Sequence, residues 1–194
     1  MAPTQKRATA DTATQVLDIA ERLVQVRGFN GFSYADISSE LDLSKASLHY
    51  HFPGKAELGE ALVERYAARF ADALSAIDRR GGDAPAKLEA YASIYAGVLR
   101  DRRMCLCGML AADAATLPAP MRAGLTGFFT ENEAWLTRVL EEGRRGGALR
   151  FTGAAASLAA FFVSSLEGAM LVARGGGGTK VFDAVAGHLL AGVR

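Results

Sequence analysis

The chain has 194 residues, half of them hydrophobic, which is enough to bury a core and excludes a chain that is disordered throughout. Its formal net charge is only +1, and residues 1–55 carry six Lys or Arg against six Asp or Glu. Overall charge therefore does not single out a nucleic-acid-binding protein, and any such role must come from a local motif. Alanine is abundant, proline is rare and β-branched residues form no alternating runs, so the composition predicts an all-α fold.

Two segments bear on where the protein is located. Lys6 and Arg7 are followed by polar residues rather than by an apolar block, so we expect no secretory signal and a cytoplasmic protein. The apolar stretch 153–173 is long enough to be considered as a membrane span, but it contains Glu167. Since an acid in the middle of a span costs about 2.5–3.5 kcal/mol, we expect a buried or interfacial helix there and no membrane partner.

The first 54 residues are predicted to form three helices. Apolar residues recur at helical spacing over residues 13–29, and Gly28 ends this first helix. Ser33 begins the second helix, with Asp36 three residues later as in a capping box, and residues 42–44 break it. Ser44 caps a third helix over residues 45–52, which the Pro-Gly pair at 53–54 stops.

Residues 55–194 are predicted to form a bundle of mostly longer helices. One runs from Lys55 to the glycine pair at 81–82, and apolar residues over 88–99 mark the next. Residues 104–109 are predicted to be a turn that leads into a short helix, and two prolines at 118 and 120 separate it from another long helix. The last two helices, at 154–174 and 179–193, are joined by four glycines.

The arrangement between Phe29 and Leu58 is typical of a helix-turn-helix, because two short capped helices are joined by a tight turn and flanked by longer helices. A small apolar core is predicted to hold the third helix at the surface, and its members are Phe29, Phe32, Ile37, Leu41, Leu43, Leu48 and Phe52. The side chains left exposed on that helix are Lys45, Ser47, His49, Tyr50 and His51. These groups can hydrogen-bond to base edges and phosphates in a major groove, which predicts double-stranded DNA as a partner.

This block resembles the TetR family of transcriptional regulators, through Phe29-x-Gly31-x-Ser33, Ile37, residues 43–53 and Lys55-x-x-Leu58. The resemblance implies a homodimer that binds operator DNA as a repressor and is released by an unidentified small-molecule effector. It also implies that Lys45, Ala46 and Ser47 lie nearest the bases, whereas Ser33, an aromatic residue of the recognition helix and Lys55 contact phosphates. The predicted DNA-binding set is Ser33, Ser44, Lys45, Ala46, Ser47, His49, Tyr50 and Lys55.

Two positions differ from the family pattern. Leu41 and Asp42 stand where the family usually has Ala-Gly in the turn, and Asp is one of the few other residues that tolerates a left-handed backbone. The turn is therefore expected to persist. His49 stands where the family usually has a phosphate-contacting Tyr, and Tyr50 follows it. The sequence leaves open which of the two contacts the DNA backbone.

The predicted domains are residues 1–54 for DNA binding and residues 55–194 for ligand sensing and dimerisation. Aromatic residues at helical spacing are usually core, but in a TetR-like body the same helices surround a mostly apolar ligand cavity. The predicted cavity residues are Tyr66, Phe70, Tyr91, Tyr95, Cys105, Met109, Phe128 and Trp135. Apolar faces on the last two helices predict the dimer interface, formed by Leu158, Phe161, Phe162, Leu166, Phe182, Val185 and Leu189.

No pattern predicts a catalytic or metal site, so we expect neither an enzyme nor a cofactor. His49 and His51 point in different directions on one helix, and His188 has no plausible partner near it in the sequence. Cys105 and Cys107 lack the second pair of ligands that a structural zinc site needs.

The sequence is also compatible with two alternative functions. Arg100, Arg102 and Arg103 directly precede the two cysteines and can lower a thiol pKa, which would suit a redox or electrophile sensor on the same DNA-binding scaffold. The competing interpretation is that Cys105 and Cys107 are small apolar residues that pack a helix start. The second alternative function is a helical small-molecule-binding protein without DNA binding.

Overall fold

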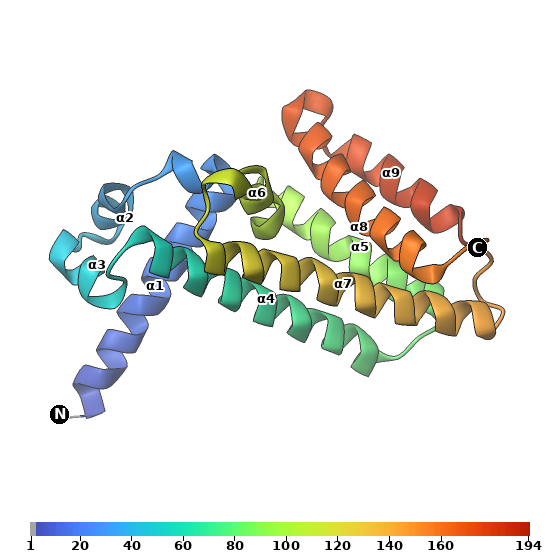
Figure 1. Cartoon of the computed structure of the whole chain (residues 1–194), viewed down its shortest axis with the longest axis horizontal. Helices are drawn as coiled ribbons and strands as arrows, with labels where there is room; N and C mark the ends of the chain where they lie inside the picture. Colours follow the sequence, from blue (N-terminus) through green and yellow to red (C-terminus); the bar gives the residue numbers. More distant parts are fainter. Residues whose placement is uncertain (1–2) are drawn as a thin grey trace. The chain divides into compact units, whose positions relative to one another are not determined.

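The computed structural model describes the backbone of residues 3–194 and the side chains of residues 11–194. Lys6 and Arg7, on which the expected absence of a secretory signal rests, lie outside the described side chains. Every regular element in the described range is helical, which confirms the predicted all-α fold (Figure 1). The α-helices are α1 (Pro3–Arg27), α2 (Tyr34–Leu41), α3 (Lys45–His51), α4 (Lys55–Arg80), α5 (Ala84–Arg100), α6 (Leu106–Ala112), α7 (Ala119–Arg145), α8 (Ala155–Val172) and α9 (Thr179–Ala191). The short 3₁₀ helices η1 (Phe29–Gly31) and η2 (Ala114–Thr116) and the π-helical segment η3 (Ala173–Gly177) complete the order.

Contacts divide the chain into two compact units. The first unit comprises residues 1–66 and 106–125, and the second comprises residues 67–105 and 126–194. Helices α4 and α7 each contribute residues to both units. The predicted functional boundary at residues 54 and 55 differs from this division, because the start of α4, the whole of α6 and the start of α7 pack with the N-terminal helices.

The helix ends in the first unit are set by local chemistry. Helix α1 begins ten residues before the predicted start and ends at Arg27; the following residue is Gly28, whose φ of 81° is easily adopted without a Cβ atom. Ser33 and Asp36 form the predicted capping box at the start of α2, in which the Asp36 carboxylate accepts a hydrogen bond from the Ser33 amide (2.8 Å). The same carboxylate also accepts from the Ser33 hydroxyl (2.7 Å). Asp42 adopts the left-handed conformation at φ 51°, as the persistence of the turn requires.

The core of the first unit holds α3 in place. Of the seven predicted core residues, five are buried, namely Phe29, Phe32, Ile37, Leu48 and Phe52, whereas Leu41 and Leu43 are half-buried. Val16, Ala20, Leu23 and Val24 of α1 supply the opposite wall, together with Leu58 and Leu62 of α4. A helix of seven residues is too short to be stable alone, so the position of α3 depends on Leu48 being packed into this core.

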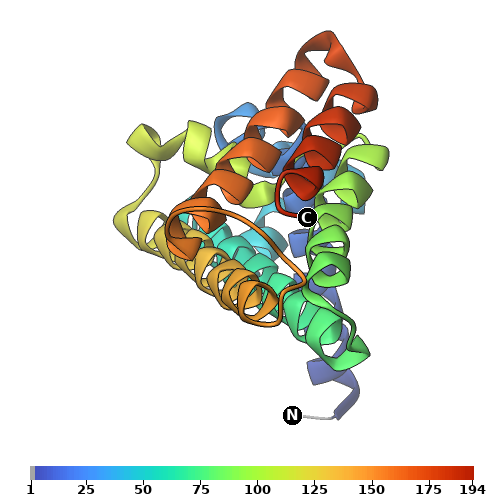
Figure 2. The same cartoon turned by 90° about the vertical axis from the view of Figure 1, so that its right-hand side faces the viewer.

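In the second unit, α8 packs against α9 and both contact α5 (Figure 2). Asp78 ties three helices of this unit together, because its carboxylate accepts from Trp135 Nε1 (3.0 Å) and Arg138 (2.6 Å) of α7 and pairs with Lys87 of α5 (3.0 Å). Burial raises the pKa of Asp78, but the hydrogen bonds from Lys87, Trp135 and Arg138 outweigh it and hold the pKa below its usual value. The stretch Ala155–Gly177 is long and apolar enough to cross a membrane by length and composition alone, and 39% of its most apolar part is buried within the chain.

Candidate nucleic-acid interface and sensing site

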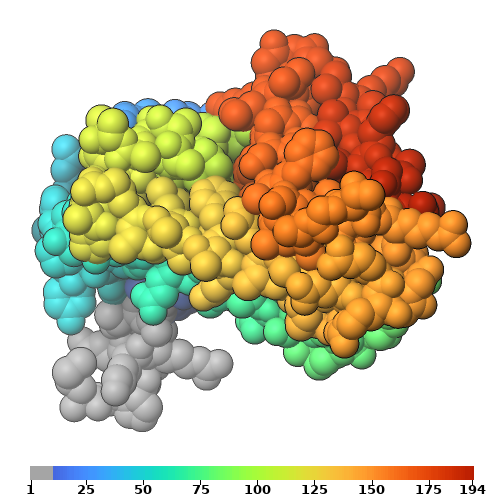
Figure 3. Space-filling view, turned by 45° about the vertical axis from the view of Figure 1, so that its right-hand side comes forward, coloured from blue at the N-terminus to red at the C-terminus, as the bar shows by residue number. Residues whose placement is uncertain are grey.

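Helix α3 presents polar side chains to solvent. Ser44 caps it by accepting a hydrogen bond from the Ser47 amide (3.1 Å), and Leu48 is its buried anchor. Tyr50 is 74% exposed, more than any other large hydrophobic residue within residues 11–194, and Lys45, Ala46 and His49 are also exposed. The cyan segment that contains α3 lies at the surface of its unit in Figure 3. This exposure has the form that a recognition helix needs.

His49 and Tyr50, which the sequence could not separate, have different surroundings. The His49 ring places Nδ1 2.9 Å from the Pro53 carbonyl, so this nitrogen carries the proton in that contact, and the ring lies 4.8 Å from the ring of Tyr34. The Tyr50 ring instead lies nearly perpendicular to the ring of His51, with the two ring centres 5.3 Å apart. His49 thus supports the turn after α3, and Tyr50 extends away from the unit's interior.

Tyr34 fixes the turn that follows α3. Its hydroxyl donates toward the main-chain carbonyls of Phe52 (2.8 Å) and Gly54 (2.7 Å). Burial, reinforced by the negative charge of Glu57, raises the pKa of Tyr34 to about 12, so the hydroxyl keeps its proton at physiological pH. Sequence reasoning missed this residue because nothing local indicates that its hydroxyl reaches the segment 52–54.

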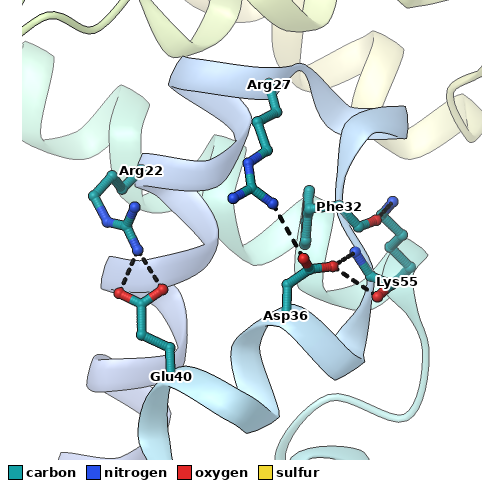
Figure 4. Close-up of polar contacts among 7 residues, drawn as sticks. Arg22, Arg27, Phe32, Asp36, Glu40 and Lys55 are labelled. Atoms are coloured by element: carbon teal, nitrogen blue, oxygen red, sulfur yellow. Dashed lines mark hydrogen bonds and ion pairs between the residues drawn. The ribbon is translucent and has the colours of Figure 1, made fainter.

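Ion pairs between α1 and α2 neutralise the carboxylates next to the motif. Arg22 pairs with Glu40, and Arg27 pairs with Asp36 at 3.1 Å (Figure 4). Hydrogen bonds from the Ser33 hydroxyl and amide, followed by the Arg27 contact, hold the pKa of Asp36 below its usual value. These two ion pairs therefore compensate the negative charges of α2, although residues 1–55 carry as many acidic as basic residues. Ser33, a predicted phosphate contact, is exposed, and its hydroxyl donates a hydrogen bond to the Asp36 carboxylate in this structure.

Lys55 lies differently from the other predicted DNA contacts. Its ammonium group donates to the Phe32 carbonyl and lies 4.3 Å from the ring centre of Phe32 (Figure 4). The same group lies 4.9 Å from the ring centre of Phe29. Burial lowers the pKa of Lys55, and the negative charges of Asp36 and Asp113 oppose that effect. In this structure Lys55 therefore joins α4 to the segment before α2, and its role as a phosphate contact stays a prediction.

The segment after α6 also holds the end of α1. The Asp113 carboxylate accepts a hydrogen bond from the Phe29 amide (2.9 Å), and Asn30 donates to Thr116 Oγ1 (2.9 Å). A Cβ atom at Gly28 would lie 3.2 Å from the Asp113 carboxylate, so glycine also leaves room for this contact. The motif is thus braced by residues more than eighty positions away along the chain, which no local pattern could have revealed.

An aromatic cluster forms the interior of the second unit. The ring of Phe70 lies 6.1 Å from Tyr91, 5.9 Å from Tyr95 and 5.1 Å from Phe128, and Trp135 stacks on Tyr91 at 5.7 Å. A cavity of about 190 Å³ between α4 and α7 is lined by the rings of Phe70, Phe128 and Trp135, and by Ala67, Ala71, Leu74, Ser75, Glu131 and Asn132. The structure thus brings together five of the predicted cavity residues, whereas Tyr66 and Met109 belong to the first unit.

A buried polar cluster lies within the same unit. Tyr91 Oη donates to Asn132 Oδ1 (3.1 Å) and is 3.1 Å from Tyr95 Oη. Glu167 of α8 is hydrogen-bonded to the Cys105 thiol, and burial raises the pKa of Glu167 to about 7 although that hydrogen bond lowers it. Sequence reasoning missed Asn132 as a site residue and used Glu167 only as an argument against a membrane span. The available signal was a polar residue on a helix face that is otherwise apolar.

The predicted dimer interface divides into two groups in the structure of one chain. Phe162, Leu166, Phe182 and Leu189 are buried within the second unit, whereas Phe161 is 58% exposed and Leu158 and Val185 are half-buried. Leu158, Phe161 and Val185 line an apolar groove of about 330 Å³ between α8 and α9. Leu171 and Val172 at the end of α8 are also exposed. Figure 3 shows α8 and α9, orange to red, at the surface of their unit.

Cys105 and Cys107 are both buried and unbridged. Within residues 11–194, no group of three or more His, Cys, Asp or Glu side chains comes together in a way that could hold a metal ion.

Comparisons with known proteins assign the family. Residues 16–62 match the family described as bacterial regulatory proteins, tetR family, and residues 84–189 match the tetracyclin repressor-like C-terminal domain. A solved TetR-family regulator from Agrobacterium tumefaciens is 33% identical, with a TM-score of 0.92 over 95% of this chain and 98% of that one. The transcriptional regulator AcuR of Cereibacter sphaeroides is 30% identical over 152 residues, which are 76% of this chain and 69% of AcuR. The repressor NemR of Escherichia coli K12 is 27% identical over 155 residues, 76% of either chain. The chain therefore belongs to the TetR family and is a DNA-binding transcriptional regulator.

Proposed function

We propose that the protein is a cytoplasmic repressor that binds operator DNA as a homodimer and is released by a small-molecule effector, and that it is not an enzyme. The observation that carries the proposal is the presentation of α3, a short helix whose exposed side carries Lys45, His49 and Tyr50. The ion pairs of α1 with α2 support it, since they neutralise Asp36 and Glu40 beside the motif. Electrostatic repulsion of DNA phosphates is thereby reduced.

Within the motif we assign different roles to the DNA-binding residues. Lys45, Ala46 and Ser47 lie in the first turn of α3 and would read base edges, since the start of a recognition helix enters the major groove. Tyr50 would contact a phosphate, because its ring is exposed, whereas the His49 ring is hydrogen-bonded to the Pro53 carbonyl. Ser33, Ser44 and Lys55 remain predicted contacts, and for Lys55 the ammonium group would have to leave the Phe32 carbonyl.

The dimer would form through α8 and α9, by covering the groove lined by Leu158, Phe161 and Val185 with the same surface of a second copy. Phe161 supports this proposal because an exposed ring of that size on an apolar face is unfavourable in a monomer. Burial of this face against a second copy also accounts for the high apolar content of α8 without a membrane. Phe162, Leu166, Phe182 and Leu189 would support the interface from beneath it.

The effector would bind in the second unit and act through α4, which runs without interruption from residue 55 beside the motif to residue 80 in the body. A ligand that favours one position of α4 over another would change the spacing of the two recognition helices in the dimer. Operator DNA, with its fixed half-site spacing, would then be bound less tightly.

The test is binding to DNA selected by the protein itself from a random-sequence pool. We expect the selected duplex to carry two half-sites about one helical turn apart, and to bind at least 100-fold more tightly than a scrambled duplex of equal composition. Equal affinity for both duplexes, or selection of no common sequence, would contradict a sequence-specific regulator and favour the small-molecule-binding protein without DNA binding.

A cysteine-based redox or electrophile sensor is the second candidate, and the hydrogen bond between the Cys105 thiol and Glu167 is the observation that favours it. The burial of both thiols instead supports a packing role. A variant with both Cys105→Ser and Cys107→Ser should keep operator affinity. If the wild type is released from DNA by an electrophile such as N-ethylmaleimide and the double variant is not, the sensor is the better account.

A further inference from the structure

We propose that Glu167 of α8 anchors the effector, and that the effector is a small organic cation, a protonated amine carried on an apolar or aromatic body. The proposal rests on the proposed function, because it names the class of ligand to which this repressor would respond.

In the buried polar cluster, the hydroxyl groups of Tyr91 and Tyr95 and the Cys105 thiol already donate hydrogen bonds within the cluster. Tyr91 donates to Asn132, so in the contact between the two hydroxyls Tyr95 must donate to Tyr91. The Cys105 thiol donates its hydrogen bond to Glu167. What remains are acceptors, namely Oε1 of Glu167 and the lone pairs of the Tyr95 hydroxyl. A ligand that fits this cluster must therefore bring N–H donors.

Glu167 is also a carboxylate without a cation. Its Oε1 atom is buried and has no hydrogen-bond partner, and no cation is among the groups that shift its pKa. Burial is the main reason why the pKa of Tyr91 and of Tyr95 is raised, and the negative charge of Glu167 raises both further. Glu167 therefore lies near the two hydroxyls. A buried unpaired carboxylate is costly, and a bound ammonium group would relieve that cost.

The aromatic surroundings favour the same class of ligand. The rings of Phe70, Tyr91, Tyr95 and Trp135 form one cluster, and the faces of such rings attract cations. The cavity of about 190 Å³ offers room in the same unit, and its lining residue Asn132 is hydrogen-bonded to Tyr91. Because pockets for drug-sized ligands have volumes of roughly 300–1,000 Å³, the effector is expected to be small.

The experiment compares three probes that share one ring and differ in charge: benzylamine as its cation, benzyl alcohol and benzoate. Binding to the full-length protein is measured at pH 8 by calorimetry and by the shift of the melting temperature. We expect benzylamine to bind and raise the melting temperature, and the other two probes to bind at least tenfold more weakly. Glu167→Gln should lose at least tenfold in benzylamine affinity, whereas the matched variant Glu141→Gln, at an exposed position of α7 that does not line the cavity, should keep it.

Three results would overturn the proposal: no binding of benzylamine to the wild type, equal binding of benzyl alcohol, or unchanged benzylamine affinity in folded Glu167→Gln. Circular dichroism and operator binding show that each variant is folded. The same operator measurement separates the two proposals. A wild type that binds operator but not benzylamine contradicts only the ligand class, and one that binds benzylamine but no DNA contradicts the proposed function.

Discussion

The ammonium group of Lys55, the first residue of α4, donates a hydrogen bond to the main-chain carbonyl of Phe32, just before α2 begins. The same group lies over the rings of Phe29 and Phe32. We expect Lys55→Met, which keeps the aliphatic stem, to lower the free energy of unfolding by about 1–2 kcal/mol, because it removes a charge-assisted hydrogen bond and two cation–π contacts.

The same variant tests the phosphate contact that the sequence predicts for Lys55. If Lys55 keeps its hydrogen bond to the Phe32 carbonyl when the protein binds DNA, the salt dependence of operator affinity should be the same in Lys55→Met as in the wild type. If the ammonium group moves to a phosphate, the slope of log affinity against log salt should fall by about 0.9 for each phosphate that the variant no longer neutralises. Urea unfolding together with affinities at several salt concentrations separates the two roles.

Tyr50 and His49 should differ in their effect on DNA binding. Removing the exposed ring in Tyr50→Ala should weaken binding to operator and scrambled DNA by a similar factor without changing the melting temperature, because a phosphate contact carries no sequence information. His49→Ala should instead lower the melting temperature, since it removes the contact with the Pro53 carbonyl. A lower melting temperature for Tyr50→Ala, with unchanged DNA affinity, would mean that these assignments are reversed.

Phe161→Glu should split the dimer. The ring is exposed in one chain, so a charge there disturbs the interface without disturbing the core of the second unit. We expect a folded monomer at micromolar concentration by analytical ultracentrifugation. The control Ala148→Glu adds the same charge at an exposed site in the turn after α7 and should remain dimeric. A dimeric Phe161→Glu protein would show that the interface lies elsewhere.

Glu167 should make stability depend on pH. Its pKa is raised from 4.5 to about 7 in the folded chain, so the folded state binds the proton more tightly than the unfolded state does. The resulting stabilisation is fully present below pH 4.5 and is lost as the pH rises through 7. The charged groups on α5 and α9, the helices that pack against α8, are Lys87, Glu89, Arg100, Lys180, Asp183 and His188, and none of them contributes to this shift.

Relative to Glu167→Gln, the wild type should therefore lose up to about 3 kcal/mol of unfolding free energy between pH 5 and pH 8. Urea unfolding of both proteins at the two pH values measures this difference, and titrations of other carboxylates cancel. A difference that is independent of pH would show that Glu167 titrates normally.

Local chemistry explains why much of the motif could be predicted. The capping roles of Ser33 and Ser44, the left-handed Asp42 and the exposed side of α3 depend on residues within four positions of one another. The orientation of Lys55 and the hydrogen bond from Phe29 to Asp113 depend on packing between remote segments, which no spacing rule contains. Apolar residues occur on every side of α8, so periodicity could not separate the buried Phe162 from the exposed Phe161.

The central claim is that α3 reads a DNA sequence, and Lys45 tests it most directly. Affinities of the wild type and Lys45→Ala are measured for the selected operator, for operators changed at single positions and for scrambled DNA. Lys45→Ala should lose about 1–3 kcal/mol on the operator, relax the preference at one base position in each half-site, and lose much less on scrambled DNA. Equal losses on operator and scrambled DNA, with no base position affected, would contradict the claim.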